Sequence, residues 1–114
     1  QLFDANVVKL VRDSNNRALY FSRATIPWSR DEFAGGAEVT RALQAYRRHV
    51  GIYGFCTDFL ARFAAAPPVR IEELECLEQL RAIDFGACII AADAVAACGA
   101  GIDTRADLEQ VRRA

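Results

Sequence analysis

Residues Asn6–Arg23, NVVKLVRDSNNRALYFSR, decide the fold because two strand-like segments flank a single turn. The first segment, Asn6–Asp13, is rich in β-branched residues, and the second, Arg17–Arg23, is also typical of a strand. Between them, Ser14-Asn15-Asn16 supplies side chains that bond their own backbone in turns. Pro27 ends the second strand because proline cannot donate to a strand ladder. We therefore predict a β-hairpin.

Further strand-like segments follow the hairpin. Tyr46–Phe55, YRRHVGIYGF, predicts another strand despite its two glycines, and Ala87–Ala92 predicts a short buried strand. Pro27–Phe33 is expected to be loop. Gly35–Gln44 favours no single structure.

Helical segments are interspersed with these strands. Thr57–Ala65 predicts a short helix that stops before a Pro-Pro pair, since proline cannot continue a helix. Ile71–Phe85 has apolar residues at helical spacing, with Gly86 as a natural C-cap. Thr104–Arg113 opens with a T-x-x-D pattern similar to a capping box. Strands mixed with helices indicate an α/β or α+β chain.

Length and charge limit the function classes. The 114 residues correspond to a single domain, 1–114, and 53% hydrophobic residues with 25% charged residues indicate a globular chain. The net charge is −1, which gives no electrostatic support for a nucleic-acid or membrane-surface partner. No apolar run approaches the roughly 18 residues that a membrane span needs. We also expect no secretory signal, because the first residues lack a basic and apolar leader.

The cysteines indicate no metal site. They are widely spaced and form no C-x-x-C pair, whereas a zinc site needs closely paired ligands. Without a secretory signal, we expect four free and partly buried thiols rather than disulfides. These residues are Cys56, Cys76, Cys88 and Cys98.

Glu78 has an unusual predicted position. At about 100° per residue, it projects between Ile71 and Leu74, on the apolar face of the expected helix. A carboxylate there must be paired or used, because burying a bare charge is costly. From position alone, an ion pair with Arg81 is favoured over a functional role.

His49 and Tyr53 share one face of the expected strand. They would lie about 13 Å apart, with Gly51 between them, as on the floor of a polar pocket. A structural histidine is the more frequent alternative. Arg23, following Leu19 and Phe21 on one strand face, suits a carboxylate or phosphate ligand. An arginine with a packed stem and a solvated head explains it equally well.

Asp103 lies in a glycine-rich segment just before the last expected helix. It would cap that helix, or it would bind magnesium, a hard cation that prefers oxygen ligands. A single aspartate would need further ligands from elsewhere.

Four segments resemble the 3-deoxy-manno-octulosonate cytidylyltransferase (CMP-Kdo synthetase) family, in the family's order and with nearly its spacing. They are ALYFSRATIPW at Ala18–Trp28, RHVGIYGF at Arg48–Phe55, LEQLR at Leu77–Arg81 and GIDTRADLEQVR at Gly101–Arg112. The resemblance extends from about Phe3 onward and concerns the C-terminal half of a family member. It implies an α/β nucleotide-diphospho-sugar transferase fold with a mixed sheet and helices.

The resemblance also implies an activity. Family members transfer CMP from CTP to the anomeric hydroxyl of Kdo, giving CMP-Kdo and pyrophosphate for lipopolysaccharide biosynthesis, and they require Mg²⁺. The resemblance implies a cytoplasmic homodimer, joined through this portion, with no nucleic-acid or membrane partner. The loop that holds the CTP triphosphate is missing from these residues, so we expect no CTP-binding group here and an inactive fragment. No catalytic group is assigned.

The site residues follow from the same resemblance. Asp103 would bind Mg²⁺ together with an aspartate from the earlier half. The residues expected to contact Kdo are Arg23, His49, Tyr53, Glu78 and Gln79. The alternatives are a cytidylyltransferase for a related acid sugar, amino-Kdo or sialic acid, and a non-catalytic dimerisation module.

Overall fold

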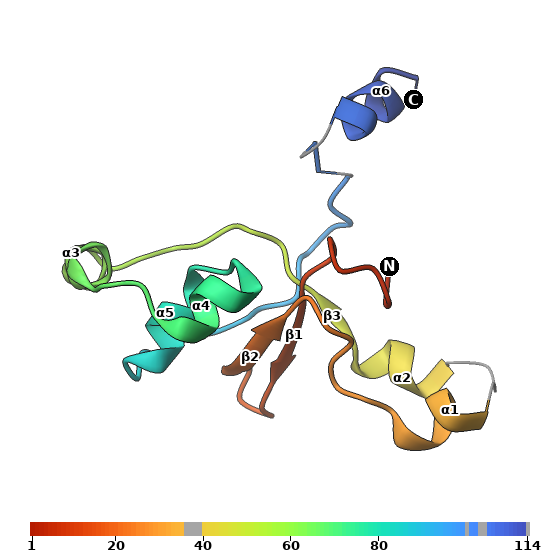
Figure 1. Ribbon diagram of the computed structural model, residues 1–114, viewed down its shortest axis with the longest axis horizontal. Coiled ribbons are helices and arrows are strands. Elements are labelled where there is room, and N and C mark those ends of the chain that lie inside the picture. Colours follow the sequence, from red (N-terminus) through yellow and green to blue (C-terminus); the bar gives the residue numbers. More distant parts are fainter. Residues whose placement is uncertain (36–39, 100, 103–104, 114) are drawn as a thin grey trace.

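The computed structural model describes residues 1–35, 40–99, 101–102 and 105–113. A pair of strands is followed by a pair of helices, a short third strand and a run of further helices (Figure 1). The elements are β1 (Lys9–Arg12), β2 (Ala18–Ser22), α1 (Arg30–Gly35), α2 (Thr40–Ala45), β3 (Arg47–Arg48), α3 (Thr57–Ala65), α4 (Arg70–Glu75), α5 (Gln79–Asp84) and α6 (Arg105–Arg113).

The predicted hairpin is confirmed. β1 pairs antiparallel with β2, β3 adds antiparallel to the other edge of β1, and the strand order is β2-β1-β3. In the turn, the amide of Asp13 donates to Arg17 O at 2.9 Å. Asn16 has a φ of 63°, in the left-handed region that asparagine tolerates. The turn chemistry in the sequence therefore marked the right position.

Leu19 is an extra residue in β2. The register passes from Val11–Tyr20 to Arg12–Ala18, so Leu19 has no partner on β1. Such a bulge breaks the alternation of faces. Leu19 is 50% exposed whereas Phe21 is 2% exposed. The prediction that these two residues share a face was therefore wrong.

The core lies where α5 packs against β2. Its buried members are Leu10, Ala18, Phe21, Leu77 and Leu80. The segment after α5 returns to the hairpin, where Ala18 donates to Ile89 O and Ala91 donates to Asn16 O, each at 2.8 Å. Only an isolated bridge forms there, between Arg17 and Ile90, so the expected buried strand Ala87–Ala92 was wrong.

The expected helix Ile71–Phe85 is two helices that meet at a corner. Cys76 ends α4 in the left-handed conformation, with φ 52° and ψ 50°, and α5 begins at Gln79. The corner leaves Leu74 70% exposed while Leu77 and Leu80 remain buried. A continuous apolar stripe in the sequence therefore does not correspond to one continuous face.

Other segments also differ from expectation. The strand expected over Tyr46–Phe55 is confined to β3, because β1 offers it only Lys9 and Leu10 as partners. α1 begins inside the expected loop Pro27–Phe33. α2 occupies the end of the undecided stretch Gly35–Gln44. α3 matches its predicted helix at both ends.

The molecule is open. Its radius of gyration is 16.0 Å, against roughly 13 Å for a compact domain of about 100 residues. Figure 1 shows α3, the α1–α2 pair and α6 projecting away from the sheet in different directions. Within the described residues, no helix is long and apolar enough to cross a membrane.

Candidate functional site

The five residues expected to contact sugar come from three segments. Arg23 follows β2, His49 and Tyr53 lie in the irregular stretch after β3, and Glu78 and Gln79 stand at the start of α5. Asp103 and Thr104 lie outside the described residues, so neither the expected metal ligand nor the expected cap has a described position.

His49 and Tyr53 touch directly. His49 Nε2 lies 2.7 Å from Tyr53 Oη. The imidazole also packs edge-on against Phe21, with ring centroids 5.3 Å apart. The predicted 13 Å separation was wrong because the chain is not extended here. The two side chains do lie on one side of the chain, as expected, and they are joined by a hydrogen bond.

Burial and Glu78 set the charge states of this pair. Burial lowers the pKa of His49 below 6.5, and the nearby Glu78 carboxylate opposes that shift. Burial and Glu78 together raise the pKa of Tyr53 to about 12. At neutral pH the pair is therefore a neutral imidazole and a protonated phenol. Because Glu78 acts on both groups, the three side chains share one electrostatic environment.

Glu78 itself is exposed, not directed into the core. It occupies the N-cap position of α5 without a side-chain capping hydrogen bond, and the corner at Cys76 turns it away from the apolar face. The pair expected with Arg81 was also wrong, because Arg81 Nε donates to Glu72 Oε2 at 2.8 Å. An exposed carboxylate at a helix start remains free to accept hydrogen bonds from ligand hydroxyls.

Gln79, unlike Glu78, is buried. Its side chain is only 5% exposed, yet within the described part of the chain Nε2 has no hydrogen-bond partner. An unsatisfied buried donor costs roughly 1–3 kcal/mol. A ligand oxygen at this position would remove that cost.

Arg23 is anchored to backbone carbonyls. Its Nε donates to Glu75 O at 2.7 Å, Nη1 donates to Ala5 O at 3.1 Å, and Nη2 approaches Cys76 O at 3.4 Å. A guanidinium carries five N–H groups, so two remain for a ligand. The side chain thus links β2 to the α4–α5 corner and still presents donors.

Two residues that support Arg23 were missed from the sequence. Lys9 is 2% exposed, and its ammonium donates to Asp4 O, Val7 O and Arg23 O at 2.6–2.8 Å. Burial is the main cause that lowers its pKa. Glu75 accepts hydrogen bonds from Ser22 and Arg23. The sequence signal for Lys9 was its position inside the apolar run NVVKLV, where a charged residue is unusual.

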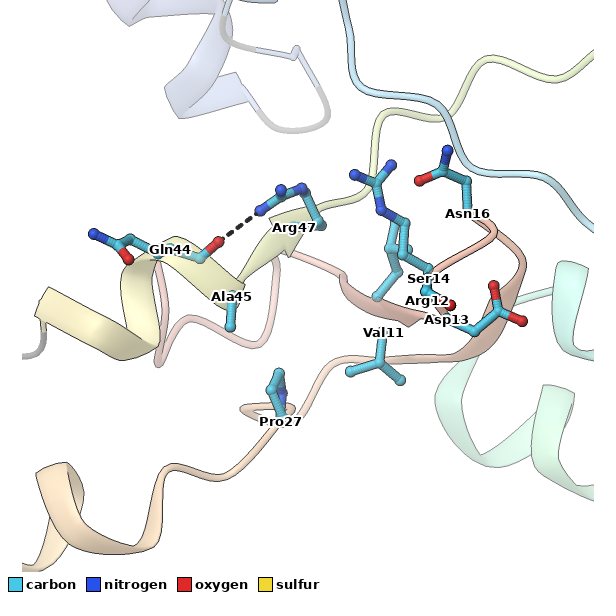
Figure 2. Close-up of a pocket in the computed structure, with 10 residues that line it drawn as sticks. Val11, Arg12, Asp13, Ser14, Asn16, Pro27, Gln44, Ala45 and Arg47 are labelled. Atoms are coloured by element: carbon cyan, nitrogen blue, oxygen red, sulfur yellow. Dashed lines mark hydrogen bonds between the residues drawn. The ribbon is translucent and has the colours of Figure 1, made fainter.

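A separate hollow lies beside the β1–β2 turn (Figure 2). It has a volume of about 430 Å³ and is bounded by the β1–β2 turn, Pro27, α2 and Arg47. None of the expected sugar-contacting residues lines it. We therefore place the candidate site at the His49–Tyr53 pair and the α4–α5 corner, where the buried polar groups are.

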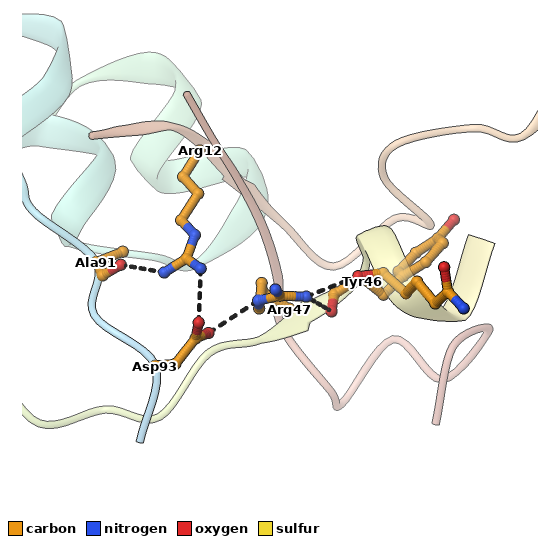
Figure 3. Close-up of polar contacts among 6 residues, drawn as sticks. Arg12, Tyr46, Arg47, Ala91 and Asp93 are labelled. Carbon is orange, nitrogen blue, oxygen red and sulfur yellow. Dashed lines mark hydrogen bonds and ion pairs between the residues drawn. The ribbon is translucent and has the colours of Figure 1, made fainter. Parts of the chain in front are cut away.

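Arg12 and Arg47 border that hollow and share one carboxylate (Figure 3). Asp93 Oδ2 lies 2.7 Å from Arg12 Nη2, and Asp93 Oδ1 lies 2.8 Å from Arg47 Nε. Hydrogen bonding to Arg12 is the main cause that holds the pKa of Asp93 below its ordinary value. This network joins β1, β3 and the segment after α5, and sequence reasoning did not find it.

Metal and thiol chemistry have little support in the described ranges. There, no group of three or more His, Cys, Asp or Glu side chains is placed to hold a metal ion. The four cysteines are free, as predicted, but exposed rather than partly buried. They contribute no candidate site.

Comparison with known proteins identifies similar chains. A family model described as cytidylyltransferase matches residues 1–89. Two curated relatives are named 3-deoxy-manno-octulosonate cytidylyltransferase. The protein from Stenotrophomonas maltophilia strain K279a is 53% identical over 96% of this chain and 42% of its own length. The protein from Methylococcus capsulatus strain Bath is 47% identical over 99% of this chain and 44% of its own length. The chain therefore spans less than half the length of these relatives.

A solved structure agrees with the sequence matches. It is a CMP:2-keto-3-deoxy-manno-octonic acid synthetase complexed with CTP, with a TM-score of 0.79 and 38% identity. The match covers 96% of this chain and 42% of that one. The α/β nucleotide-sugar transferase fold expected from the sequence is thereby confirmed.

Proposed function

Because the chain belongs to the cytidylyltransferase family, we propose that it is the acceptor-sugar part of an enzyme that transfers CMP from CTP to Kdo. The products are CMP-Kdo and pyrophosphate, for lipopolysaccharide biosynthesis. The names of the relatives and the CTP complex of the similar structure support this assignment. The observation that carries it is the buried Nε2 of Gln79, which lacks a hydrogen-bond partner among the described residues.

The site residues suit an acid sugar. The two remaining N–H groups of Arg23 bind the sugar carboxylate, since a guanidinium matches carboxylate geometry. Gln79 Nε2 donates to a sugar oxygen. The His49–Tyr53 pair and Glu78 hold hydroxyl groups.

These contacts act by positioning. The anomeric oxygen, held in line, forms a bond to the α-phosphorus of CTP while the bond to pyrophosphate breaks and the hydroxyl proton is released. Holding two reactants in this geometry supplies much of the rate of a bimolecular reaction. The chain's own side chains thus orient the acceptor, and CTP is held by residues outside 1–114. Residues 1–114 alone are therefore inactive.

Mg²⁺ is part of the proposal. Asp103 suits it chemically, because Mg²⁺ takes one or two protein carboxylates together with phosphate oxygens. The resemblance supports a second aspartate as its partner ligand, because one aspartate alone does not complete a Mg²⁺ site. The ion, when bound, neutralises phosphate charge.

The proposed enzyme is a cytoplasmic homodimer. The resemblance supports the dimer, and four free thiols suit a reducing compartment. The near-neutral charge of the chain gives a nucleic-acid or membrane partner no support.

Pyrophosphate release by the complete gene product tests the function. We expect turnover with CTP and Kdo, weaker turnover with amino-Kdo or sialic acid, and none from residues 1–114 alone. A preference for another acid sugar would reassign the acceptor. Absence of turnover with every acid sugar would contradict the enzyme and leave a non-catalytic dimerisation module.

A further inference from the structure

Glu75 joins two segments of the candidate site. Its Oε1 accepts a hydrogen bond from Ser22 Oγ at 2.6 Å, and its Oε2 accepts one from the backbone amide of Arg23 at 2.9 Å. Its own backbone carbonyl accepts from Arg23 Nε at 2.7 Å. One residue therefore holds both the main chain and the side chain of Arg23.

The opposite side of Arg23 is held as well. The carbonyl of Arg23 accepts from the buried ammonium of Lys9 at 2.6 Å. The end of β2 is thus fixed from both sides, by Lys9 from β1 and by Glu75 from α4. An arginine side chain loses much rotamer freedom when it binds a ligand, so fixing its base and its Nε beforehand lowers that cost.

Glu75 also lies beside the corner that starts α5. Cys76, the next residue, is left-handed, and its carbonyl is approached by Arg23 Nη2 at 3.4 Å. Gln79 follows three residues later as the first residue of α5. The contacts of Glu75 therefore set where Arg23 lies relative to Gln79.

We propose that Glu75 is a positioning residue of the acid-sugar site, which fixes Arg23 relative to Gln79 without touching the sugar. Both of its carboxylate oxygens already accept hydrogen bonds, from the Ser22 hydroxyl and the Arg23 amide, which leaves the Arg23 guanidinium and Gln79 to meet the ligand. This role rests on the proposed function, because it concerns the geometry of the site that binds the acceptor.

Glu75→Gln in the complete gene product tests the role. The glutamine amide keeps the shape of the side chain and one acceptor oxygen but loses the negative charge that the Ser22 hydroxyl and the Arg23 amide share. We expect the KM for the acid sugar to rise about tenfold, while kcat and the KM for CTP change less than about twofold. Glu73→Gln is the matched control, since it makes the same change on an exposed carboxylate of α4 and should change neither KM.

Two further measurements separate the outcomes. Ser22→Ala removes the hydroxyl that donates to Glu75 Oε1 and accepts from the Ala24 amide at 3.0 Å, and it should raise the acid-sugar KM by a smaller factor. Amide hydrogen exchange at Arg23 should accelerate in Glu75→Gln and not in Glu73→Gln, with or without substrate. Faster exchange with an unchanged acid-sugar KM would overturn the positioning role and leave a structural clamp. Absence of CMP transfer by the unaltered enzyme would instead overturn the proposed function, and with it this role.

Discussion

Arg81 is paired with Glu72 on the preceding helix and not with Glu78, three positions before it. Its Nη1 also donates to Ala66 O at 3.0 Å, and its guanidinium lies 4.9 Å from the centroid of the Phe63 ring. Arg81 therefore ties α5 to α4 and to the end of α3. Because Arg81 is occupied in this way, Glu78 is left free at the start of α5.

The Glu72–Arg81 pair should make stability depend on pH. The hydrogen bond from Arg81 is the main cause that holds the pKa of Glu72 below 4.5. A lowered carboxyl pKa in the folded state stabilises above the unfolded pKa, and that stability is lost as pH falls through the folded pKa. We expect Glu72→Gln to lower Tm by a few degrees at pH 7 and the difference to shrink below about pH 4. Thermal unfolding across pH, with Glu73→Gln as control, measures this; a difference that does not change with pH would contradict it.

His49 is the one histidine in the sequence, so its titration gives a single assignable signal. We expect it to titrate below 6.5 by NMR, because burial disfavours the imidazolium. Glu78→Gln should lower the pKa further, because the Glu78 carboxylate raises it. Since the folded pKa is lowered, the associated stability is complete above 6.5 and is lost as pH falls through the folded value. An unchanged His49 pKa in Glu78→Gln would show that the two groups are not close.

The sequence predicted those elements of the fold that neighbouring residues mark, and it missed those that depend on contacts between distant segments. The hairpin and α3 were predicted because a turn sequence and a Pro-Pro pair mark them locally. The corner at Cys76 was not predicted, because no sequence pattern marks a cysteine in the left-handed backbone conformation. That corner is stabilised by Arg23, which lies some fifty residues away in the chain.

The site was predicted in part for the same reason. His49 and Tyr53 were placed on one side, and they do meet, although through an irregular segment rather than a strand. Lys9 and Glu75 were missed because their partners are backbone atoms and a serine brought in by folding. Contacts of that kind cannot be read from residue spacing.

Gln79→Leu should separate stability from binding. Removing a buried amide whose Nε2 has no described partner relieves a cost of about 1–3 kcal/mol, so we expect Tm to stay level or rise. The same change removes a donor to the sugar, so the acid-sugar KM should rise at least about tenfold while the KM for CTP stays near normal. Thermal unfolding and steady-state kinetics measure both quantities. A fall in Tm with an unchanged acid-sugar KM would mean that Gln79 is structural.

Glu78→Ala tests the exposed carboxylate alone. No hydrogen bond of the described fold uses its side chain, so we expect an unchanged Tm. A hydrogen bond to a charged group contributes about 1.5–3 kcal/mol, which corresponds to a rise of roughly ten- to a hundredfold in the acid-sugar KM. Kinetics with each substrate varied in turn would decide; an effect confined to the KM for CTP would refute the assignment. Glu73→Ala on α4 is the control.

Asp103→Asn separates the two roles open to Asp103. Asparagine caps a helix nearly as well as aspartate, so a capping role predicts little loss of stability or turnover. A Mg²⁺ ligand acts through its full negative charge, so a metal role predicts intact folding and loss of most turnover. The neighbouring Gly99 and Gly101 favour the metal role, because glycine lets backbone approach a phosphate–metal cluster closely.

The measurement of Asp103→Asn uses the complete gene product. Tm and turnover are followed across a Mg²⁺ series, and direct Mg²⁺ binding in the presence of CTP is measured by calorimetry. We expect an unchanged Tm, a higher Mg²⁺ requirement and weaker Mg²⁺ binding. Asp107→Asn, a carboxylate in the first turn of α6, is the control and should leave Mg²⁺ binding unchanged. Near-normal turnover with an unaltered Mg²⁺ dependence would show that Asp103 works through its shape, as a helix cap, and not through its charge.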